Sequence, residues 1–203
     1  MIRNLYLLYE NILGILDTIK IFVSKSEKEY AMNLNIKIGK NSIIINNGVI
    51  NRKIKKIIKT NKDLSQIQKN KKINVISVCR LVNQKNIIEI LEIAKILPNI
   101  NFLILGDGDL YEEIKNIISS RNIRNVFLKG RKKNVFKYLY SADIYLSTSL
   151  YEGLPISIIE SMSIGLPIIA SNVIGNKDTI ENGKTGYLYD LHNINMAAKY
   201  ISL

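Results

Sequence analysis

The sequence predicts an α/β protein built around an open, doubly wound parallel sheet of the Rossmann-like type. From residue 73 onward, short apolar segments alternate regularly with segments of helical pattern. The apolar segments are continuous, not alternating with polar residues, as in parallel strands covered on both faces. Ligands of such sheets bind beyond the carboxyl ends of the strands. The candidate functional residues that end predicted strands are Arg80, Gly106, Gly130 and Glu152.

Three segments are predicted, with boundaries at 1–50, 51–70 and 71–203. Within 1–50 the apolar periodicity predicts helices at 2–16 and 26–33 and strands at 18–23 and 43–46. Residues 51–70 are basic and poor in turn residues, and are interpreted as a surface helix and linker. Beyond them we expect strands at 73–79, 102–105, 126–128, 144–147, 167–170 and 186–189. Helices are expected near 84–97, 109–120, 133–140, 155–164 and 176–181, and from 195.

The composition is that of a globular protein, with 47% apolar and 23% charged residues in 203. No stretch of 18 residues lacks a charge, so no membrane span is expected. Glu10 and Asp17 interrupt the apolar amino terminus, and no small-residue cleavage site follows, so a signal peptide is not expected. The single cysteine, Cys79, excludes an internal disulfide and fits a reducing, cytoplasmic compartment. It is interpreted as a small core residue.

The formal net charge is +12, with basic clusters at 52–62, 69–72 and 131–133. Such clusters can attract nucleic acid, anionic lipid or nucleotide diphosphates. The abundance of Ile, Asn and Lys is typical of an AT-rich gene, which accounts for much of the charge. Aromatic residues are not interleaved with the basic runs, so nucleic acid is not expected as a partner. Association with the inner face of an anionic membrane stays open.

The most specific segment is 151–171, in which Glu152 and Glu160 flank the first turns of a short helix. Pro155 in the first turn and Gly165 just past the last turn are the expected punctuation of that helix. Eight helical residues rise about 12 Å, so the two carboxylates could grip the two ends of an extended ligand. The N–H groups of the helix amino terminus could hold an anion between them. Either glutamate alone would be an ordinary solvated charge.

This segment resembles the retaining glycosyltransferases of family 4, which have the GT-B fold. Their signature is Glu-Gly-x-Pro opening a spacing of seven residues to a second Glu, then Gly-x-Pro, a hydrophobic pair and Ala-Ser. The matching residues are Glu152, Gly153, Pro155, Glu160, Gly165, Pro167, Ala170 and Ser171.

The resemblance implies a role for each candidate residue. Arg80 and Lys85, five apart after the first strand of the main domain, would hold the donor diphosphate as its charge grows. Glu152 would accept hydrogen bonds from hydroxyls of the transferred sugar, and Glu160 would bind the ribose hydroxyls. These three roles follow the match of the loop and helix to the family pattern.

Main-chain groups would complete the donor site. The N–H groups of Gly153 and Leu154 could reach the sugar or phosphate, and the absent side chain at 153 would allow close approach. Lys129 and Gly130 would lie against the base. The family's retention is described as front-face attack, so Glu152 is not assigned as a covalent nucleophile.

The resemblance also implies an incomplete architecture. Residues 52–203 resemble nearly all of the nucleotide-sugar-binding domain, whereas 1–50 resemble only the end of the amino-terminal, acceptor-side domain. The family's catalytic histidine and acceptor loop belong to that first domain and have no counterpart here. We therefore expect a fragment, a split gene whose other half is a separate chain, or a decayed gene.

A metal site is the main competing interpretation. Asp107 and Asp109 form an Asp-x-Asp pattern after a strand, as in the GT-A glycosyltransferases that use a divalent ion. The family 4 pattern also has Gly-Asp-Gly here, and Arg80 and Lys85 already supply positive charge, so neither a metal nor another cofactor is expected. Asp109 could instead cap a helix. Asp143 is expected in a cap or turn and His192 at the surface.

The sequence thus predicts a metal-independent, retaining glycosyltransferase acting on a nucleotide-diphosphate sugar and a polysaccharide or glycolipid acceptor. The main alternative is a non-catalytic nucleotide-sugar-binding module or one half of a two-chain transferase. A sugar-nucleotide epimerase and a basic nucleic-acid binder are weaker alternatives.

Overall fold

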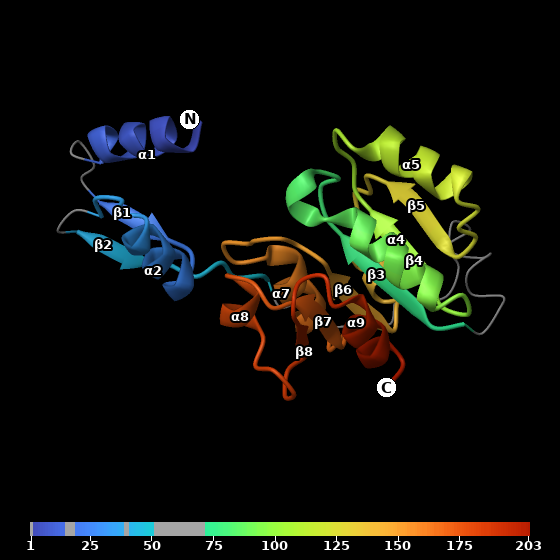
Figure 1. The fold of residues 1–203 in the computed structure, drawn as a ribbon. Helices are drawn as coiled ribbons and strands as arrows, with labels where there is room; N and C mark the ends of the chain where they lie inside the picture. Colours follow the sequence, from blue (N-terminus) through green and yellow to red (C-terminus); the bar gives the residue numbers. More distant parts are fainter. Residues whose placement is uncertain (1, 15–18, 39–40, 51–71) are drawn as a thin grey trace.

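The computed structural model describes residues 2–14, 19–38, 41–50 and 72–203. The predicted surface helix and linker at 51–70 lie outside the described residues. Two parallel sheets are present in the described part of the chain (Figure 1). The smaller pairs β1 (Lys20–Phe22) with β2 (Ser42–Ile44) and accompanies α1 (Ile2–Leu13) and α2 (Lys25–Asn33).

The larger sheet has six parallel strands in the order β5-β4-β3-β6-β7-β8. Their bounds are Asn74–Val78 (β3), Asn101–Leu105 (β4), Val126–Gly130 (β5), Ile144–Ser147 (β6), Ile168–Ser171 (β7) and Tyr187–Tyr189 (β8). The chain runs outward from β3 to β5, then returns to pair β6 with the other edge of β3. The predicted doubly wound parallel sheet is confirmed, and its topological switch point lies between β3 and β6.

Both faces of this sheet are buried, as the continuously apolar strands predicted. Val75 belongs to one core cluster, together with residues of α4 (Ile87–Ile96), α5 (Tyr111–Ser120) and α9 (Ile194–Ile201). The next residue, Ile76, belongs to a second cluster with residues of α6 (Phe136–Leu139) and α7 (Ile156–Ser163). Neighbouring side chains of a strand point to opposite faces, so each strand contributes to both clusters.

One predicted helix is divided in the structure. A single helix was expected over 84–97, but a short 3₁₀ turn, η2 (Asn83–Lys85), precedes α4. Asn86 separates the two with φ of 48°, a left-handed conformation that Asn tolerates better than most residues. The bend places Lys85 on the loop at the carboxyl end of β3 instead of inside the helix.

The amino-terminal elements contact the larger domain through α2. Ser24 caps α2, because its hydroxyl accepts from Glu27 N, and Glu27 Oε2 accepts from Val23 N, just before the cap, at 2.8 Å. The Ser26 hydroxyl donates to Asp178 Oδ1 at 2.7 Å, in α8 (Asn176–Thr179). These bonds place the amino terminus of α2 against the carboxyl-end loops of the larger sheet.

Candidate functional site

The centre of the candidate site is an ion pair at the switch point. Lys85 lies on the loop after β3, and Glu152 lies on the loop after β6. Lys85 Nζ is 2.6 Å from Glu152 Oε1, and the two side chains are only 18% and 10% exposed. A cation and a carboxylate are therefore held together, largely out of water, at the position where open α/β sheets bind ligands.

Hydroxyl groups after β6 fix both partners of this pair. The Ser149 hydroxyl donates to Glu152 Oε1 at 2.6 Å, and the Thr148 hydroxyl bonds the main-chain oxygens of Lys85 and Asn86. The buried Ser171 hydroxyl donates to the Ser149 carbonyl at 2.6 Å. Sequence reasoning missed these residues, although a run of three hydroxyl residues at 147–149, which begins at the last residue of the strand predicted over 144–147, was a usable signal.

Two buried, uncharged groups, the Cys79 thiol and the Tyr145 hydroxyl, lie near the ion pair. Burial raises the pKa of the Cys79 thiol to about 12, with the Glu152 carboxylate adding to the rise and Lys85 opposing it. Burial likewise raises the pKa of Tyr145, whose hydroxyl is 2.8 Å from Ser157 Oγ. Both groups stay protonated near neutral pH, which supports the interpretation of Cys79 as a core residue and not a nucleophile.

The segment that carries the two glutamates folds as predicted. Pro155 directly precedes α7, and Gly165, with φ of 77°, ends it. Glu160 is half-buried on the second turn of this helix. The Leu154 carbonyl accepts from Asn47 Nδ2 at 2.9 Å, which ties the end of the amino-terminal segment to this loop.

Gly153 and Gly175 are required for packing. A Cβ at Gly153 would lie 3.0 Å from Val23 Cγ2 and 3.3 Å from Glu27 Oε1, so its missing side chain makes room for Val23, just after β1, and for α2. The sequence interpretation had assigned that space to a ligand. Gly175 has φ of 81°, and a Cβ there would lie 2.7 Å from the Glu152 carbonyl. The Glu152 loop is thus packed closely from two sides.

The other predicted residues follow the outer strands. Arg80 is exposed after β3, and Lys129 lies near the end of β5 with its Nζ 5.6 Å from the centre of the Phe127 ring. Gly106 N donates to the Gly130 carbonyl at 3.0 Å, which joins the ends of β4 and β5. Arg80, directly after β3, and Lys129 and Gly130, at the end of β5, therefore lie at the same carboxyl end of the sheet as Lys85, with β4 between the two strands.

The structure gives the aspartates local roles. Asp107 Oδ1 accepts from Gly108 N, and the Asp107 carbonyl accepts from Leu81 N. The prediction that Asp109 caps a helix is wrong: α5 begins after Leu110, and no side chain caps it, because the chain makes a further turn first. Asp143 is structural as expected, with Oδ2 accepting from Asn74 N. Within the described ranges, no three His, Cys, Asp or Glu residues cluster as metal ligands would.

A second acidic group, missed by sequence reasoning, is buried on α4. Glu89 is only 4% exposed, and its carboxylate accepts from the Tyr189 hydroxyl at 2.8 Å and from Asn86 Nδ2 at 2.8 Å. His192, whose side chain is 75% exposed as the surface prediction implies, has Nδ1 3.2 Å from the same carboxylate. This cluster braces the left-handed Asn86 that follows Lys85.

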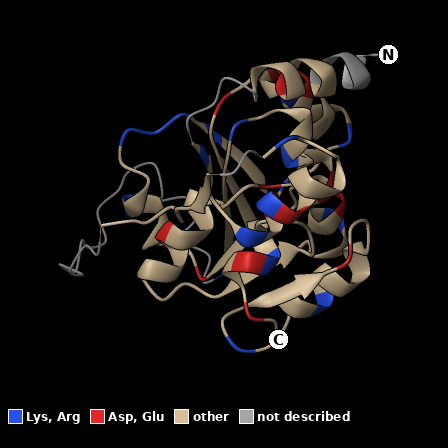
Figure 2. Ribbon diagram, turned by 90° about the vertical axis from the view of Figure 1, so that its left-hand side faces the viewer, with Lys and Arg blue, Asp and Glu red and all other residues tan. Residues whose placement is uncertain are grey.

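The distribution of charge and the hydropathy of the helices concern the expected partners of the chain and the predicted absence of a membrane span. In the view of Figure 2, Lys and Arg occur on many of the described elements, with Asp and Glu among them. No helix in the described part of the chain is both long and apolar enough to cross a bilayer.

The fold and the site define an α/β protein with a candidate ligand site at the switch point of its sheet. Comparison with known proteins identifies the family: residues 58–203 match the model of the glycosyl transferases group 1. The chain belongs to this family. The glycosyltransferase prediction is confirmed at the level of the family and of the GT-B-type fold.

Three relatives illustrate the similarity. The poly(ribitol-phosphate) α-N-acetylglucosaminyltransferase of Staphylococcus aureus (strain COL) is 38% identical over 133 residues, covering 62% of this chain and 27% of that protein. The UDP-Gal:α-D-GlcNAc-diphosphoundecaprenol α-1,3-galactosyltransferase of Escherichia coli is 35% identical over 125 residues, covering 58% and 32%. A crystal structure of an S. aureus TarM variant with Fondaparinux, α-GlcNAc-glycerol and UDP has a TM-score of 0.76 at 31% identity, covering 89% and 35%. The matched region thus spans about a third of each relative.

Proposed function

We propose that the chain is the donor-binding part of a retaining, metal-independent glycosyltransferase. It would transfer a sugar from a nucleotide-diphosphate sugar to a polysaccharide or glycolipid acceptor. The observation that carries this proposal is the Lys85–Glu152 pair, 2.6 Å apart at the switch point of the sheet. Membership in the glycosyl transferases group 1 and the similarity to TarM, whose variant was crystallised in complex with UDP, support it.

The proposed roles follow from the charge and hydrogen-bonding capacity of each group. Arg80 and Lys85 hold the diphosphate, whose negative charge increases as the bond to the sugar breaks. Glu152 binds the sugar: Lys85 and Ser149 both bond Oε1, which leaves Oε2 to accept from a sugar hydroxyl. Glu160, on the second turn of α7, takes the two ribose hydroxyls, which suit a two-oxygen acceptor.

Main-chain groups supply the remaining contacts. The N–H groups of Gly153 and Leu154 bind the sugar or a phosphate, and Lys129 and Gly130 lie beside the base. Arg80 and Lys85 provide the positive charge that a divalent ion would otherwise supply, so neither metal nor cofactor enters the proposal. In the transfer step, the acceptor oxygen bonds to the anomeric carbon as the carbon–oxygen bond to phosphate breaks, and a phosphate oxygen takes the acceptor's proton.

The architecture and partners are proposed on the same basis. Residues 1–50 correspond to the end of an acceptor-side domain, 51–70 to a linker and 71–203 to the nucleotide-sugar domain. A separate amino-terminal half would complete the cleft, and the complex would act in the cytoplasm, at the inner face of the membrane when its acceptor is lipid-linked. The second candidate is a non-catalytic nucleotide-sugar-binding module; the matched region spans 27% and 32% of the two curated relatives.

Calorimetric titration with UDP, ADP and GDP tests the donor site. The wild-type chain should bind one of the three, and the double substitution Arg80→Ala/Glu160→Ala should abolish that binding. The matched control, Arg124→Ala/Glu113→Ala, removes the same charges from exposed positions outside the site and should bind like the wild type. Binding that survives in the Arg80/Glu160 variant contradicts the site.

Turnover separates the two candidate functions. The chain is incubated with the radiolabelled sugar nucleotide whose diphosphate it binds. Release or transfer of labelled sugar by the chain alone supports an autonomous transferase, whereas binding without turnover supports the module or the half-enzyme.

A further inference from the structure

A cavity adjoins the candidate site on the side of the amino-terminal segment. Its volume is about 820 Å³, and it lies between α2 and the loops that follow β6 and β7. Glu152 and Gly153 line it, so it opens beside the residues proposed to hold the donor sugar. Side chains from both parts of the chain contribute to its wall: Glu27, Tyr30, Gln84, Tyr151, Asn172 and Lys177.

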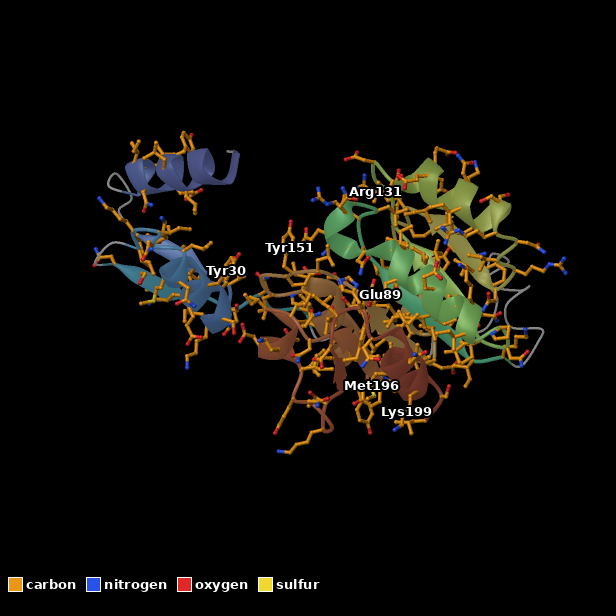
Figure 3. All side chains as sticks on the ribbon, viewed as in Figure 1. Tyr30, Glu89, Arg131, Tyr151, Met196 and Lys199 are labelled. Atoms are coloured by element: carbon orange, nitrogen blue, oxygen red, sulfur yellow. The ribbon has the colours of Figure 1, made fainter. Side chains whose placement is uncertain are left out.

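Two tyrosines give the cavity its chemical character. Tyr30 comes from α2 and Tyr151 from the loop after β6, and Figure 3 shows them on the two facing sides of the gap between these elements. Their side chains are strongly exposed, at 51% and 60%. Large aromatic side chains usually bury their rings, and tyrosines exposed in a cavity wall offer apolar faces with a polar tip.

The remaining lining groups are suited to hydroxyl-rich ligands. Gln84 and Asn172 carry amides that both donate and accept, while Lys177 donates and Glu27 accepts. Aromatic faces combined with such groups match a pyranose ring, which has apolar C–H faces and a rim of hydroxyls. The volume falls within the range of about 300–1,000 Å³ that small-molecule sites occupy.

The wall is fixed by contacts between the two parts of the chain. Glu27 is held by its bond from Val23 N, and α2 is anchored through Ser26 to Asp178. Gln84 Nε2 donates to the Tyr151 carbonyl at 2.8 Å, which fixes the loop that carries the second tyrosine. The two aromatic rings are therefore presented by anchored segments.

We infer that this cavity is a subsite for a pyranose unit of the acceptor glycan, held between Tyr30 and Tyr151. This inference rests on the proposed transferase function and adds the acceptor's chemical class and its contact residues. Glu152 and Gly153 line the cavity, so a sugar bound there lies beside the residues that the proposed function assigns to the donor sugar.

Saturation-transfer NMR with the methyl glycosides of glucose, galactose and N-acetylglucosamine tests the subsite on the full chain. We expect transfer to the ring protons of at least one glycoside. Tyr30→Ala and Tyr151→Ala should each weaken that binding about fivefold or more, whereas Tyr30→Phe and Tyr151→Phe keep the ring face and should retain most of it. Tyr9→Ala removes a tyrosine of similar exposure (59%) outside the cavity and should have no effect.

Titration with UDP, ADP and GDP on the same samples separates this inference from the proposed function. Loss of glycoside binding with unchanged nucleotide binding supports the subsite and shows that the variants are folded. Glycoside binding unaffected by the alanine variants, or absent from a wild type that binds nucleotide, overturns the subsite alone. Glycoside binding that depends on the tyrosines in a chain that binds no nucleotide supports the subsite and contradicts the donor site.

Discussion

Replacing Lys85 by Met should destabilise the protein and weaken nucleotide binding. The substitution keeps most of the side-chain volume and removes the charge that lies 2.6 Å from Glu152. Removing one partner of a buried ion pair costs about 3–5 kcal/mol, whereas exposed pairs contribute about 0–1 kcal/mol. Lys85 and Glu152 are 18% and 10% exposed, and Glu152 keeps the Ser149 hydroxyl. We therefore expect a loss of about 2–3 kcal/mol.

A double-mutant cycle isolates the pair itself. Unfolding by urea is measured for Lys85→Met, Glu152→Gln and the double variant, and the coupling free energy should be about 1.5–2.5 kcal/mol. The control cycle uses Lys115 and Glu112, a 3.3 Å pair whose side chains are 60% and 71% exposed. Its coupling should stay below about 0.5 kcal/mol and decrease with salt, because exposed charges are screened. Equal coupling in the two cycles would refute the argument from burial.

The same variant tests the proposed role of Lys85 in binding. A charge-assisted contact to a phosphate contributes about 1.5–3 kcal/mol. Lys85→Met should therefore reduce affinity for the bound nucleoside diphosphate about 10- to 150-fold, since about 1.36 kcal/mol is tenfold. If Lys85→Met leaves the affinity for the nucleoside diphosphate unchanged, Lys85 does not bind the diphosphate, even if the predicted loss of stability is observed.

Two further predictions concern Gly106 and Cys79, which lie at the carboxyl ends of β4 and β3. Gly106→Ala should lower the free energy of unfolding by more than about 3 kcal/mol or prevent folding. The reason is that a Cβ at Gly106, whose φ is 142°, would lie 1.7 Å from the Cys79 carbonyl oxygen. Urea unfolding measures the loss, and the control Gly48→Ala, which has open space around it, should be nearly neutral. The Cys79 thiol should resist alkylation at pH 8 until urea unfolds the chain. Its folded pKa, about 12, lies above the ordinary value of 9.0. Between pH 9 and pH 12 the native state therefore binds more protons at Cys79 than the unfolded state does, and the free energy of unfolding should fall as the pH rises through this range. Rapid alkylation of the native chain, or a free energy of unfolding that does not change in this range, would contradict the interpretation of Cys79 as a buried, protonated thiol.

Much of the fold follows from local patterns in the sequence. The six strands of the larger sheet begin and end within two residues of their predicted positions, because continuous apolar runs between turn residues have few other stable conformations. Helix α7 begins and ends where Pro155 and Gly165 require. The division of the helix predicted over 84–97 was missed, because the left-handed Asn86 is held in part by a tertiary bond, in which the Thr148 hydroxyl donates to its carbonyl.

The candidate site was only partly accessible from the sequence. The spacing of Glu152 and Glu160 and the Arg80–Lys85 pair were visible as patterns, and their roles stay predictions. The contributions of Ser149, Thr148 and Glu89 were missed, because hydroxyls and single carboxylates occur on every surface, and burial is what distinguishes these three residues. The packing role of Gly153 likewise depends on α2, whose position no local pattern gives.

By itself, the sequence determined the elements, the parallel character of the sheet and the family signature around Glu152, since each depends on residues close together in the chain. Only the tertiary structure decided the strand order, and with it the meeting of Lys85 and Glu152 across 67 residues. The same alternation of strands and helices is compatible with several orders of parallel strands. The packing of β6 beside β3 selects the one that creates the switch point.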